Sequence, residues 1–275
     1  TNLICLKLLG IDVLKNVVNL KLSKSIRLLR FIVNSFITIS YNANQTIEKT
    51  LNSVANQSYK NIEYIIVDGG SMDNTLDICN SFPHVSKIIS EPDNGVYDAF
   101  NKGLKLATGD IIGFLNADDI FFNENSVQEI VNAFSNNETD IVYGNLDYIN
   151  KEAKVIRNWI SKPYEGGLIK KAWMPAHPTF YCKKEVYDHL GGYNDSFKIG
   201  GDFELCLRFL EVNKVPSFYL NKKIVKMLVG GVSNSGFKSK WTIYKEELRA
   251  FKINKIYVNP LTFFFYKLKK LKQFI

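Results

Sequence analysis

The sequence is poor in the residues that build zinc centres, dithiol motifs and membrane spans. It holds three histidines and four cysteines among 275 residues. The cysteines lie far apart and form no Cys-x-x-Cys pair, so neither a zinc site nor a redox motif is indicated. Each stands among apolar residues, which predicts small buried side chains in a reducing compartment: Cys5, Cys79, Cys182 and Cys206.

Signals for crossing or entering a membrane are also missing from the sequence. No run of about 18 uncharged apolar residues occurs, so we expect no transmembrane helix. The N-terminus lacks a compact apolar stretch and a small-residue cleavage site, so we expect no signal peptide. Together with the isolated thiols, this predicts a cytoplasmic location.

The net charge of +8 is concentrated at the two ends of the chain. Residues 1–34 carry six lysines and arginines against one aspartate, and residues 251–275 carry six lysines and no acidic residue. The segment between them is therefore mildly acidic, which argues against a nucleic-acid-binding protein. We divide the chain into a basic N-terminal segment (1–34), a central domain (35–235) and a helical, basic-aromatic extension (236–275).

The stretch from Leu261 to Phe274 interleaves aromatic and aliphatic residues with four lysines. This pattern predicts an amphipathic helix, for which two functions stay open. The helix can lie on an anionic membrane surface, or it can pack on the domain and leave its lysines in water. The N-terminal segment 1–34 can likewise bind a membrane or cover the sheet.

From about residue 35 the sequence alternates between strand and helix patterns. A β-α-β-α-β-α-β order of this kind predicts a parallel sheet with helices on both faces. The expected strands span 36–40, 62–67, 87–90 and 110–115, and the expected helices run through 47–54, 76–78 and 96–107. The later, less regular half is expected to hold helices at 126–134, 202–210 and 238–252 and strands at 140–143, 154–157 and 179–182.

Polar residues follow three of the expected parallel strands. Tyr41, Asp68 and the pair Asp118–Asp119 should share one edge, because ligands of such sheets bind at the carboxyl ends of the strands. Adjacent carboxylates repel unless a cation lies between them, so the pair suggests Mg²⁺ or Mn²⁺ that also holds a diphosphate. The alternative is an acidic turn that caps the next helix. The loop after Asp68 carries glycines that allow close approach of a ligand, but no Gly-Lys-Ser/Thr phosphate loop.

Two residues of the later half could take part in chemistry. Asp202 follows two glycines at the start of an expected helix, where it can act as a general base or simply cap the helix. His177 lies in a loop between Pro175 and Pro178, which restrict the backbone. This histidine can contact a substrate or serve a structural role.

Several short runs occur in an order that resembles one known family. The ordered set closely resembles the inverting glycosyltransferases of family 2, especially bacterial exopolysaccharide enzymes of the colanic-acid type. The resemblance covers about residues 36–233 and implies the GT-A fold, an α/β fold with a Rossmann-like nucleotide-binding sheet, a mixed acceptor-side half and a helical C-terminal extension. The runs are Ser40–Asn42, Ile66–Thr75, Ser90–Gly103, Gly109–Asp110, Leu115–Asp119, His177–Phe180, Gly191–Tyr193 and Asp202–Leu205.

The resemblance also implies roles for individual residues. Asp202 matches the catalytic base. Residues Asn116 to Asp118 match the family's Asp-x-Asp metal site, with Asp119 next to it, so Asp118 and Asp119 would hold a divalent cation, Mn²⁺ or Mg²⁺. The nucleotide-binding residues that it implies are Ser40, Tyr41, Asp68, Asn116 and Asp118. The candidate substrate contacts are His177, Glu204 and Lys102.

The activity implied is transfer of a hexosyl or N-acetylhexosaminyl group from a nucleoside-diphosphate sugar, with inversion. The acceptor would be a hydroxyl of a glycan or lipid-linked molecule in surface polysaccharide synthesis, at the inner face of the plasma membrane. Because such acceptors are often lipid-linked, the resemblance favours membrane binding by the basic tails.

Four positions depart from the family pattern. Gly69 stands where many members have a second Asp, Asn116 replaces the first Asp of the metal motif, and Gly201 replaces the Glu before Asp202. Phe100 fills the place of a common arginine. These substitutions keep a second hypothesis open, a degenerate nucleotide-sugar-binding module. A third, a nucleotidyltransferase, is disfavoured because the first strand is followed by Tyr41–Asn44 and not by a Gly/Arg/Lys loop.

Overall fold

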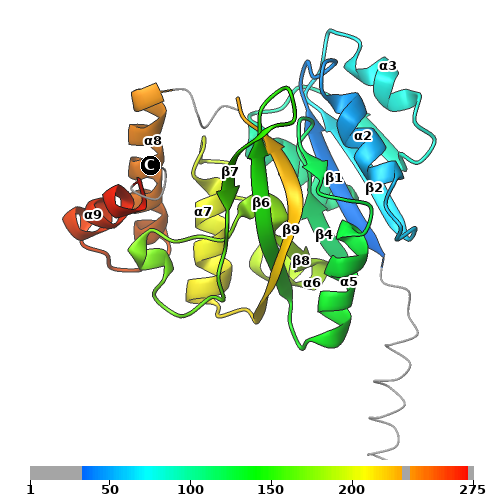
Figure 1. Cartoon of the computed structure of the whole chain (residues 1–275). Coiled ribbons are helices and arrows are strands. Elements are labelled where there is room, and N and C mark those ends of the chain that lie inside the picture. Colours follow the sequence, from blue (N-terminus) through cyan, green and yellow to red (C-terminus); the bar gives the residue numbers. More distant parts are fainter. Residues whose placement is uncertain (1–32, 231–235, 272–275) are drawn as a thin grey trace, which may run out of the picture. The chain divides into compact units, whose positions relative to one another are not determined.

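The structure is a computed structural model that describes residues 33–230 and 236–271 (Figure 1). Nearly all of the basic N-terminal segment, with Cys5, lies outside the described residues, as do residues 272–275. Cys79, Cys182 and Cys206 are buried free thiols, as expected. Among the described helices, none combines the length and apolar character needed to cross a bilayer.

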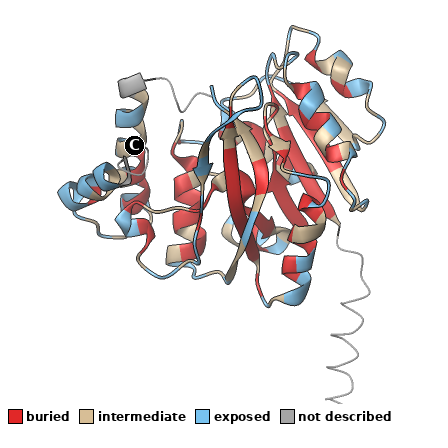
Figure 2. Cartoon of the chain, viewed as in Figure 1, coloured by how far each residue is buried: buried red, intermediate tan, exposed pale blue. Residues whose placement is uncertain are grey.

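The first half of the domain forms the expected parallel sheet. Its strands lie in the order β3-β2-β1-β4 and are formed by short apolar, largely β-branched runs. Strands β1, β2 and β4 are largely buried, whereas β3, at the edge of the sheet, is only partly buried (Figure 2). Helices α2, α3 and α4 connect the strands, as the alternating pattern predicts. The elements are β1 (Asn34–Ser40), α2 (Ile47–Ala55), β2 (Ile62–Asp68), α3 (Thr75–Asn80), β3 (Lys87–Ser90), α4 (Val96–Leu106) and β4 (Ile111–Phe114).

The register of this sheet aligns three strand ends. Ser40 is the Cα partner of Asp68 across β1 and β2, and Asp68 is the partner of Ser90 across β2 and β3. The polar residues that terminate these strands therefore form a row along one edge. This is the edge at which the alternating pattern predicts a ligand site.

The second half adds mixed pairing to the same sheet. β8 (Tyr181–Lys183) lies antiparallel to β4 and to β6 (Ile141–Ile149), while β9 (Ser217–Leu228) lies parallel to β6. Strand β6 also pairs with β7, and β9 with β5, both antiparallel. The remaining elements are β5 (Ile120–Phe121), α5 (Ser126–Asn136), β7 (Val155–Trp159), the 3₁₀ turns η1 (Ile169–Lys171) and η2 (His177–Thr179), α6 (Lys184–Leu190), α7 (Gly201–Cys206) and its π-helical continuation η3 (Leu207–Val212).

Two C-terminal helices pack on α7. In α8 (Gly236–Ile253) and α9 (Pro260–Leu271), Phe251 and Phe263 are buried, and their rings meet Phe203 of α7 edge-on at centroid distances of 5.4 and 6.2 Å. Lys267 of α9 pairs with Glu247 of α8. Figure 1 shows both helices beside α7, on the side away from α2 and α3.

Candidate active site

A cavity of about 470 Å³ opens at the aligned strand ends. It brings together Ser40 and Tyr41, two of the expected nucleotide-binding residues, and α4 forms one wall. The Tyr41 side chain is 63% exposed, so its ring is available to a planar ligand. The lining residues are Ile39, Ser40, Tyr41, Gly69, Pro92, Asp93, Val96 and Ala99.

Asp68 lies behind this cavity and is fully buried. Its carboxylate accepts hydrogen bonds from the hydroxyls of Ser40 (3.0 Å), Ser71 (2.5 Å) and Ser90 (2.8 Å) and from the backbone N–H groups of Gly70 (3.1 Å) and Ser71 (2.8 Å). Burial alone would raise its pKa, but the hydrogen bonds outweigh burial and lower it. In this arrangement Asp68 fixes the turn after β2, and its oxygens face protein donors.

Asp93 is the carboxylate that lines the cavity, and the sequence motifs give it no role. A Cβ placed on Gly69 would lie 2.5 Å from Asp93 Oδ2. The Asp93 carboxylate thus occupies the space that a side chain at position 69 would enter. The only sequence signal for Asp93 is its place in the run Glu91–Gly95.

Lys102 stabilises the segment that carries Asp93. Its ammonium group donates to the Pro92 carbonyl (2.8 Å) and pairs with Glu91 (2.9 Å) and Asp98 (3.5 Å). These contacts place Lys102 behind the cavity lining.

Phe100, at the position of the family's arginine, is buried against Phe114 and Tyr193, with ring centroids 4.6 and 4.9 Å away.

The acidic pair lies just beyond β4. Asp119 is fully buried, and its carboxylate accepts hydrogen bonds from the Asn116 amide (3.1 Å) and the Leu228 N–H (3.3 Å), while Asp118 is partly exposed. Burial raises the pKa of Asp118, and burial together with the charge of Asp118 raises the pKa of Asp119 well above its usual range. The raised pKa values mean that the ionised form of both carboxylates is unfavourable without a nearby positive charge. Such a pair of oxygen ligands suits a hard divalent cation.

Asp202 occupies the first turn of α7 and is 21% exposed. Its Oδ2 lies 3.7 Å from His177 Nε2, so the structure brings these two expected site residues together. Burial raises the pKa of Asp202, and the nearby His177 and the Tyr97 hydroxyl, 3.4 Å away, partly offset that effect. A carboxylate of raised pKa beside an imidazole is suited to accept a proton.

Gly201 and Tyr97 are packed against each other beneath this carboxylate. A Cβ on Gly201 would lie 2.6 Å from Tyr97 Cζ. The Tyr97 ring therefore takes the space next to Asp202 that a side chain at position 201 would enter. This packing leaves room for glycine at position 201 and not for a larger residue.

The loop that leads into Asp202 is anchored by helix α8. The Glu246 carboxylate accepts hydrogen bonds from three successive backbone N–H groups, those of Lys198 (2.9 Å), Ile199 (2.9 Å) and Gly200 (2.7 Å). The Tyr97 hydroxyl donates to the Ile199 carbonyl (2.6 Å). Glu246 lies outside every motif, and its isolated position on an expected helix gives no signal in the sequence.

Ring contacts lead from β6 to His177, the neighbour of Asp202. The Tyr148 ring of β6 stacks with Trp159 of β7, and Trp159 meets the His177 ring edge-on at 5.8 Å. Burial raises the pKa of Tyr148, the charge of Arg157 lowers it, and the charge of Asp119 raises it further. Tyr148 therefore lies within the electrostatic influence of the acidic pair.

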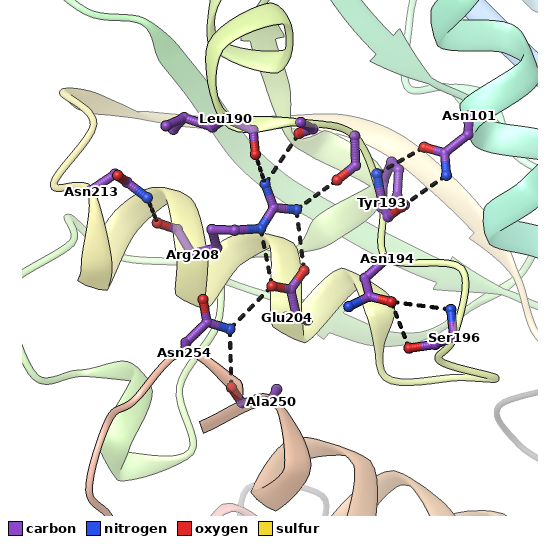
Figure 3. A network of polar contacts seen from close by, with 12 residues as sticks. Asn101, Leu190, Tyr193, Asn194, Ser196, Glu204, Arg208, Asn213, Ala250 and Asn254 are labelled. Atoms are coloured by element: carbon purple, nitrogen blue, oxygen red, sulfur yellow. Dashed lines mark hydrogen bonds and ion pairs between the residues drawn. The ribbon is translucent and has the colours of Figure 1, made fainter. Parts of the chain in front are cut away.

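Glu204 lies away from this region. It is almost fully buried, and its carboxylate accepts hydrogen bonds from Arg208 (3.0 and 3.2 Å) and the Asn254 amide (3.1 Å) (Figure 3). Arg208 in turn donates to the carbonyls of Leu190, Gly191 and Gly192. The expected substrate contact of Glu204 therefore has no support in the structure, because the residue connects α7 to the α6–α7 loop and to α8.

The profile described as Glycosyl transferase family 2 matches residues 35–200. The chain belongs to this family. The glycosyltransferase is 29% identical over 207 residues to a PGL/p-HBAD biosynthesis glycosyltransferase of Mycobacterium bovis, covering 73% of this chain and 79% of the relative. It is 34% identical over 178 residues to an uncharacterized glycosyltransferase of Mycobacterium tuberculosis, covering 63% and 67%.

Solved structures confirm the GT-A fold of the glycosyltransferase. TarS 1-349 of Staphylococcus aureus, in complex with UDP-GlcNAc, superposes with a TM-score of 0.65 at 20% identity, over 81% of this chain and 66% of that one. The mannosyltransferase PcManGT of Pyrobaculum calidifontis, in complex with GDP-Man and Mn²⁺, gives a TM-score of 0.58 at 17% identity, over 81% and 68%. At such identities the likeness establishes the fold alone.

Proposed function

We propose that this glycosyltransferase transfers a sugar from a nucleoside-diphosphate sugar to a hydroxyl group, with inversion at the anomeric carbon. One observation carries the proposal: the same domain combines an acidic pair just beyond β4, both of whose pKa values are raised by burial, with Asp202, a carboxylate of raised pKa that lies 3.7 Å from His177. Family membership disfavours the nucleotidyltransferase alternative, and the presence of both carboxylate groups argues against a module that only binds.

The donor nucleotide fits the cavity beside Tyr41. The exposed tyrosine ring can stack on a base, and Ser40 and Asp93 offer polar groups to the base or ribose. Asp68 would then act through the turn that it fixes, with Gly69 allowing close approach of the ligand. UDP-GlcNAc in TarS and GDP-Man in PcManGT are donors of this class.

The acidic pair would hold a divalent cation next to the donor diphosphate. Asp118, partly exposed, is the residue that can reach both, while Asp119 supports it from behind and is oriented by Asn116. When bound, the cation would neutralise the negative charge that develops on the leaving diphosphate. The Mn²⁺ present with PcManGT supports a cation of this kind.

Asp202 would remove the proton from the acceptor hydroxyl as that oxygen attacks the anomeric carbon. The bond to the diphosphate oxygen breaks as the new glycosidic bond forms, and a single displacement inverts the centre. General-base assistance contributes on the order of 10²–10⁴ in rate. The raised pKa of Asp202 fits proton uptake, and His177 lies where it can stabilise the ionised carboxylate before the reaction.

We further propose a glycan or lipid-linked acceptor in the synthesis of a surface polysaccharide or glycolipid, and a peripheral position on the cytoplasmic face of the membrane. The Mycobacterium bovis relative is a glycosyltransferase of a biosynthetic pathway, PGL/p-HBAD biosynthesis, which supports a biosynthetic role for this chain as well. The exposed apolar side of α9, with lysines near it, supports contact with an anionic surface.

The deciding experiment compares the wild type with Asp202→Asn and with Asp195→Asn, an exposed aspartate, as the control. We expect Asp202→Asn to lose at least about a hundredfold in sugar transfer while it binds UDP or GDP, with Mn²⁺, as tightly as the wild type in calorimetry. Asp118→Asn should instead lose the metal-dependent part of nucleotide binding. Near-normal turnover in Asp202→Asn would remove this residue from the proposed role.

A further inference from the structure

The β6–β7 hairpin places an indole ring beside the proposed base. Trp159, the last residue of β7, meets the His177 ring edge-on at 5.8 Å, and His177 Nε2 lies 3.7 Å from Asp202 Oδ2. None of the three is closed off from solvent: Trp159 is partly buried, and the side chains of His177 and Asp202 are 30% and 21% exposed. His177 thus lies between the indole and the carboxylate and is in contact with both.

The neighbours of Trp159 hold its ring in place. Tyr148 of β6 stacks with it, with centroids 6.3 Å apart and planes within 6° of parallel. The Arg157 guanidinium lies 4.9 Å from the Tyr148 centroid and 5.8 Å from that of Trp159, and Arg157 is the Cα partner of Tyr148 in the hairpin. A side chain fixed in this way loses little conformational freedom when a ligand stacks on it.

The proposed mechanism restricts what that ligand can be. The group next to Asp202 must present the hydroxyl that Asp202 deprotonates, so it is the acceptor. The donor nucleotide has its own proposed site at Tyr41 and Asp93, in a cavity whose lining does not include Asp202. A pyranose ring carries hydroxyls around its rim and an apolar C–H face, which match an imidazole–carboxylate pair next to a flat indole.

We propose that Trp159 and His177 form an acceptor subsite that binds a pyranosyl ring. Trp159 stacks on the C–H face of that ring, and His177 orients the ring so that one hydroxyl points at Asp202. Arg157 and Tyr148 are positioning residues, because they act through the indole. The assignment rests on the proposed glycosyl transfer.

The test measures binding directly, so that it does not depend on turnover. Methyl pyranosides of the gluco, galacto and manno series, as both anomers, are titrated into the full chain with UDP or GDP present. Saturation-transfer NMR then reports which sugar protons touch the protein. For the wild type we expect binding of at least one pyranoside, with transfer strongest to the ring C–H protons.

Trp159→Ala should weaken that binding about tenfold or more, and Trp159→Phe should retain most of it, because a smaller ring still stacks. Ile156→Ala is the matched control: it alters an exposed apolar side chain of the same strand and should leave binding unchanged. Thermal melts check the fold, and Trp159→Phe keeps the test decisive if the alanine variant unfolds.

Three results would overturn the subsite: no methyl pyranoside binds the wild type, Trp159→Ala binds as well as the wild type, or it loses nucleotide affinity instead. The last result would place the indole on the donor side. Failure of the proposed transfer itself would look different, since Asp202→Asn would then retain the wild-type turnover.

Discussion

At the scale of single residues, two glycines at which the sequence departs from the resembled family pattern have close neighbours in the α4 region. Gly69 and Gly201 each face a side chain from α4 or the loop before it, Asp93 and Tyr97, that fills the missing volume. The sequence alone shows only that positions 69 and 201 carry no side chain where the family pattern has one. The compensating group is near in space and distant in the chain, so only coordinates reveal it.

The packing at Gly201 predicts a measurable cost for adding one methyl group. Gly201→Ala would bring Cβ within 2.6 Å of the Tyr97 ring, which is buried and held by its hydrogen bond to Ile199. We expect a loss of about 1–3 kcal/mol in the free energy of unfolding, measured by urea titration. Gly166→Ala is the control, because nothing lies within 4 Å of its Cβ position. Equal midpoints for both variants would contradict the packing argument.

Asp202 should reduce stability at neutral pH, because its pKa in the fold is raised, chiefly by burial. Below the unfolded-state pKa of about 4 the carboxyl is protonated in both states, and the raised folded-state pKa costs no stability. As pH rises through the folded-state pKa, the buried carboxyl must ionise and the free energy of unfolding falls. We therefore expect Asp202→Asn to be more stable than the wild type near pH 7 and equally stable near pH 4. Urea midpoints across this range measure the difference, and a difference independent of pH would refute burial of the ionised carboxylate as its cause.

At the scale of elements, the parallel half of the sheet follows from the sequence and the mixed half does so only in part. Short apolar runs between helix patterns identify β1 to β4 to within a few residues. The apolar pattern predicts that β6 ends at Tyr143, yet the strand continues to Ile149 because Asn145 and Asp147 are buried with partners. Asn145 accepts from Ser161 N–H (2.8 Å), and Asp147 pairs with Lys223 (2.8 Å).

Strand β9 has no counterpart among the predicted strands, for a related reason. Its centre carries Asn221, Lys222 and Lys223, which interrupt the apolar pattern, and its pairing with β6 shifts register there. Such a strand is stabilised by its neighbours more than by its own composition. The candidate site divides in the same way. Sequence motifs point to the strand-end residues and to Asp202. The parts proposed for Asp93, Glu246 and Trp159 come from tertiary contacts, which the sequence does not show.

Helix α8 should influence the reaction through Glu246, although it contributes no residue to the cavity. Its carboxylate binds three backbone N–H groups just before Gly201, so it fixes the position of Asp202. We expect Glu246→Gln to lower kcat about tenfold with little change in the KM for the donor, since a neutral amide binds these donors more weakly. Initial rates measure both constants. Glu247→Gln, which alters the next residue and its pair with Lys267, should leave kcat unchanged.

At the scale of the whole molecule, the C-terminal helices combine an inner face that packs with an outer face that does not. Phe263 is fully buried, whereas Leu261, Phe264, Phe265 and Leu268 are 71%, 39%, 62% and 41% exposed. Their spacing of three and four residues places them on one side of α9. The two hypotheses for the basic-aromatic stretch are thus compatible, because packing uses one face and leaves an apolar one outside.

That outer face predicts binding to anionic vesicles. Lys269 of the same helix is exposed, as are Lys252 and Lys255 at and just beyond the end of α8, while the acidic residues Glu246 and Glu247 of α8 are buried. Insertion of an aromatic or leucine side chain contributes about 1.5–3 kcal/mol when fully buried, and each lysine near the surface about 1 kcal/mol.

We expect the full chain to sediment with vesicles that contain phosphatidylglycerol and much less with pure phosphatidylcholine. The double variant Leu261→Ser/Phe265→Ser should lose most of this binding, whereas Met72→Ser, which removes an 89% exposed apolar side chain elsewhere, should not. Equal sedimentation of all three proteins would show that α9 is not the docking surface, and salt-insensitive binding would show that the lysines do not contribute.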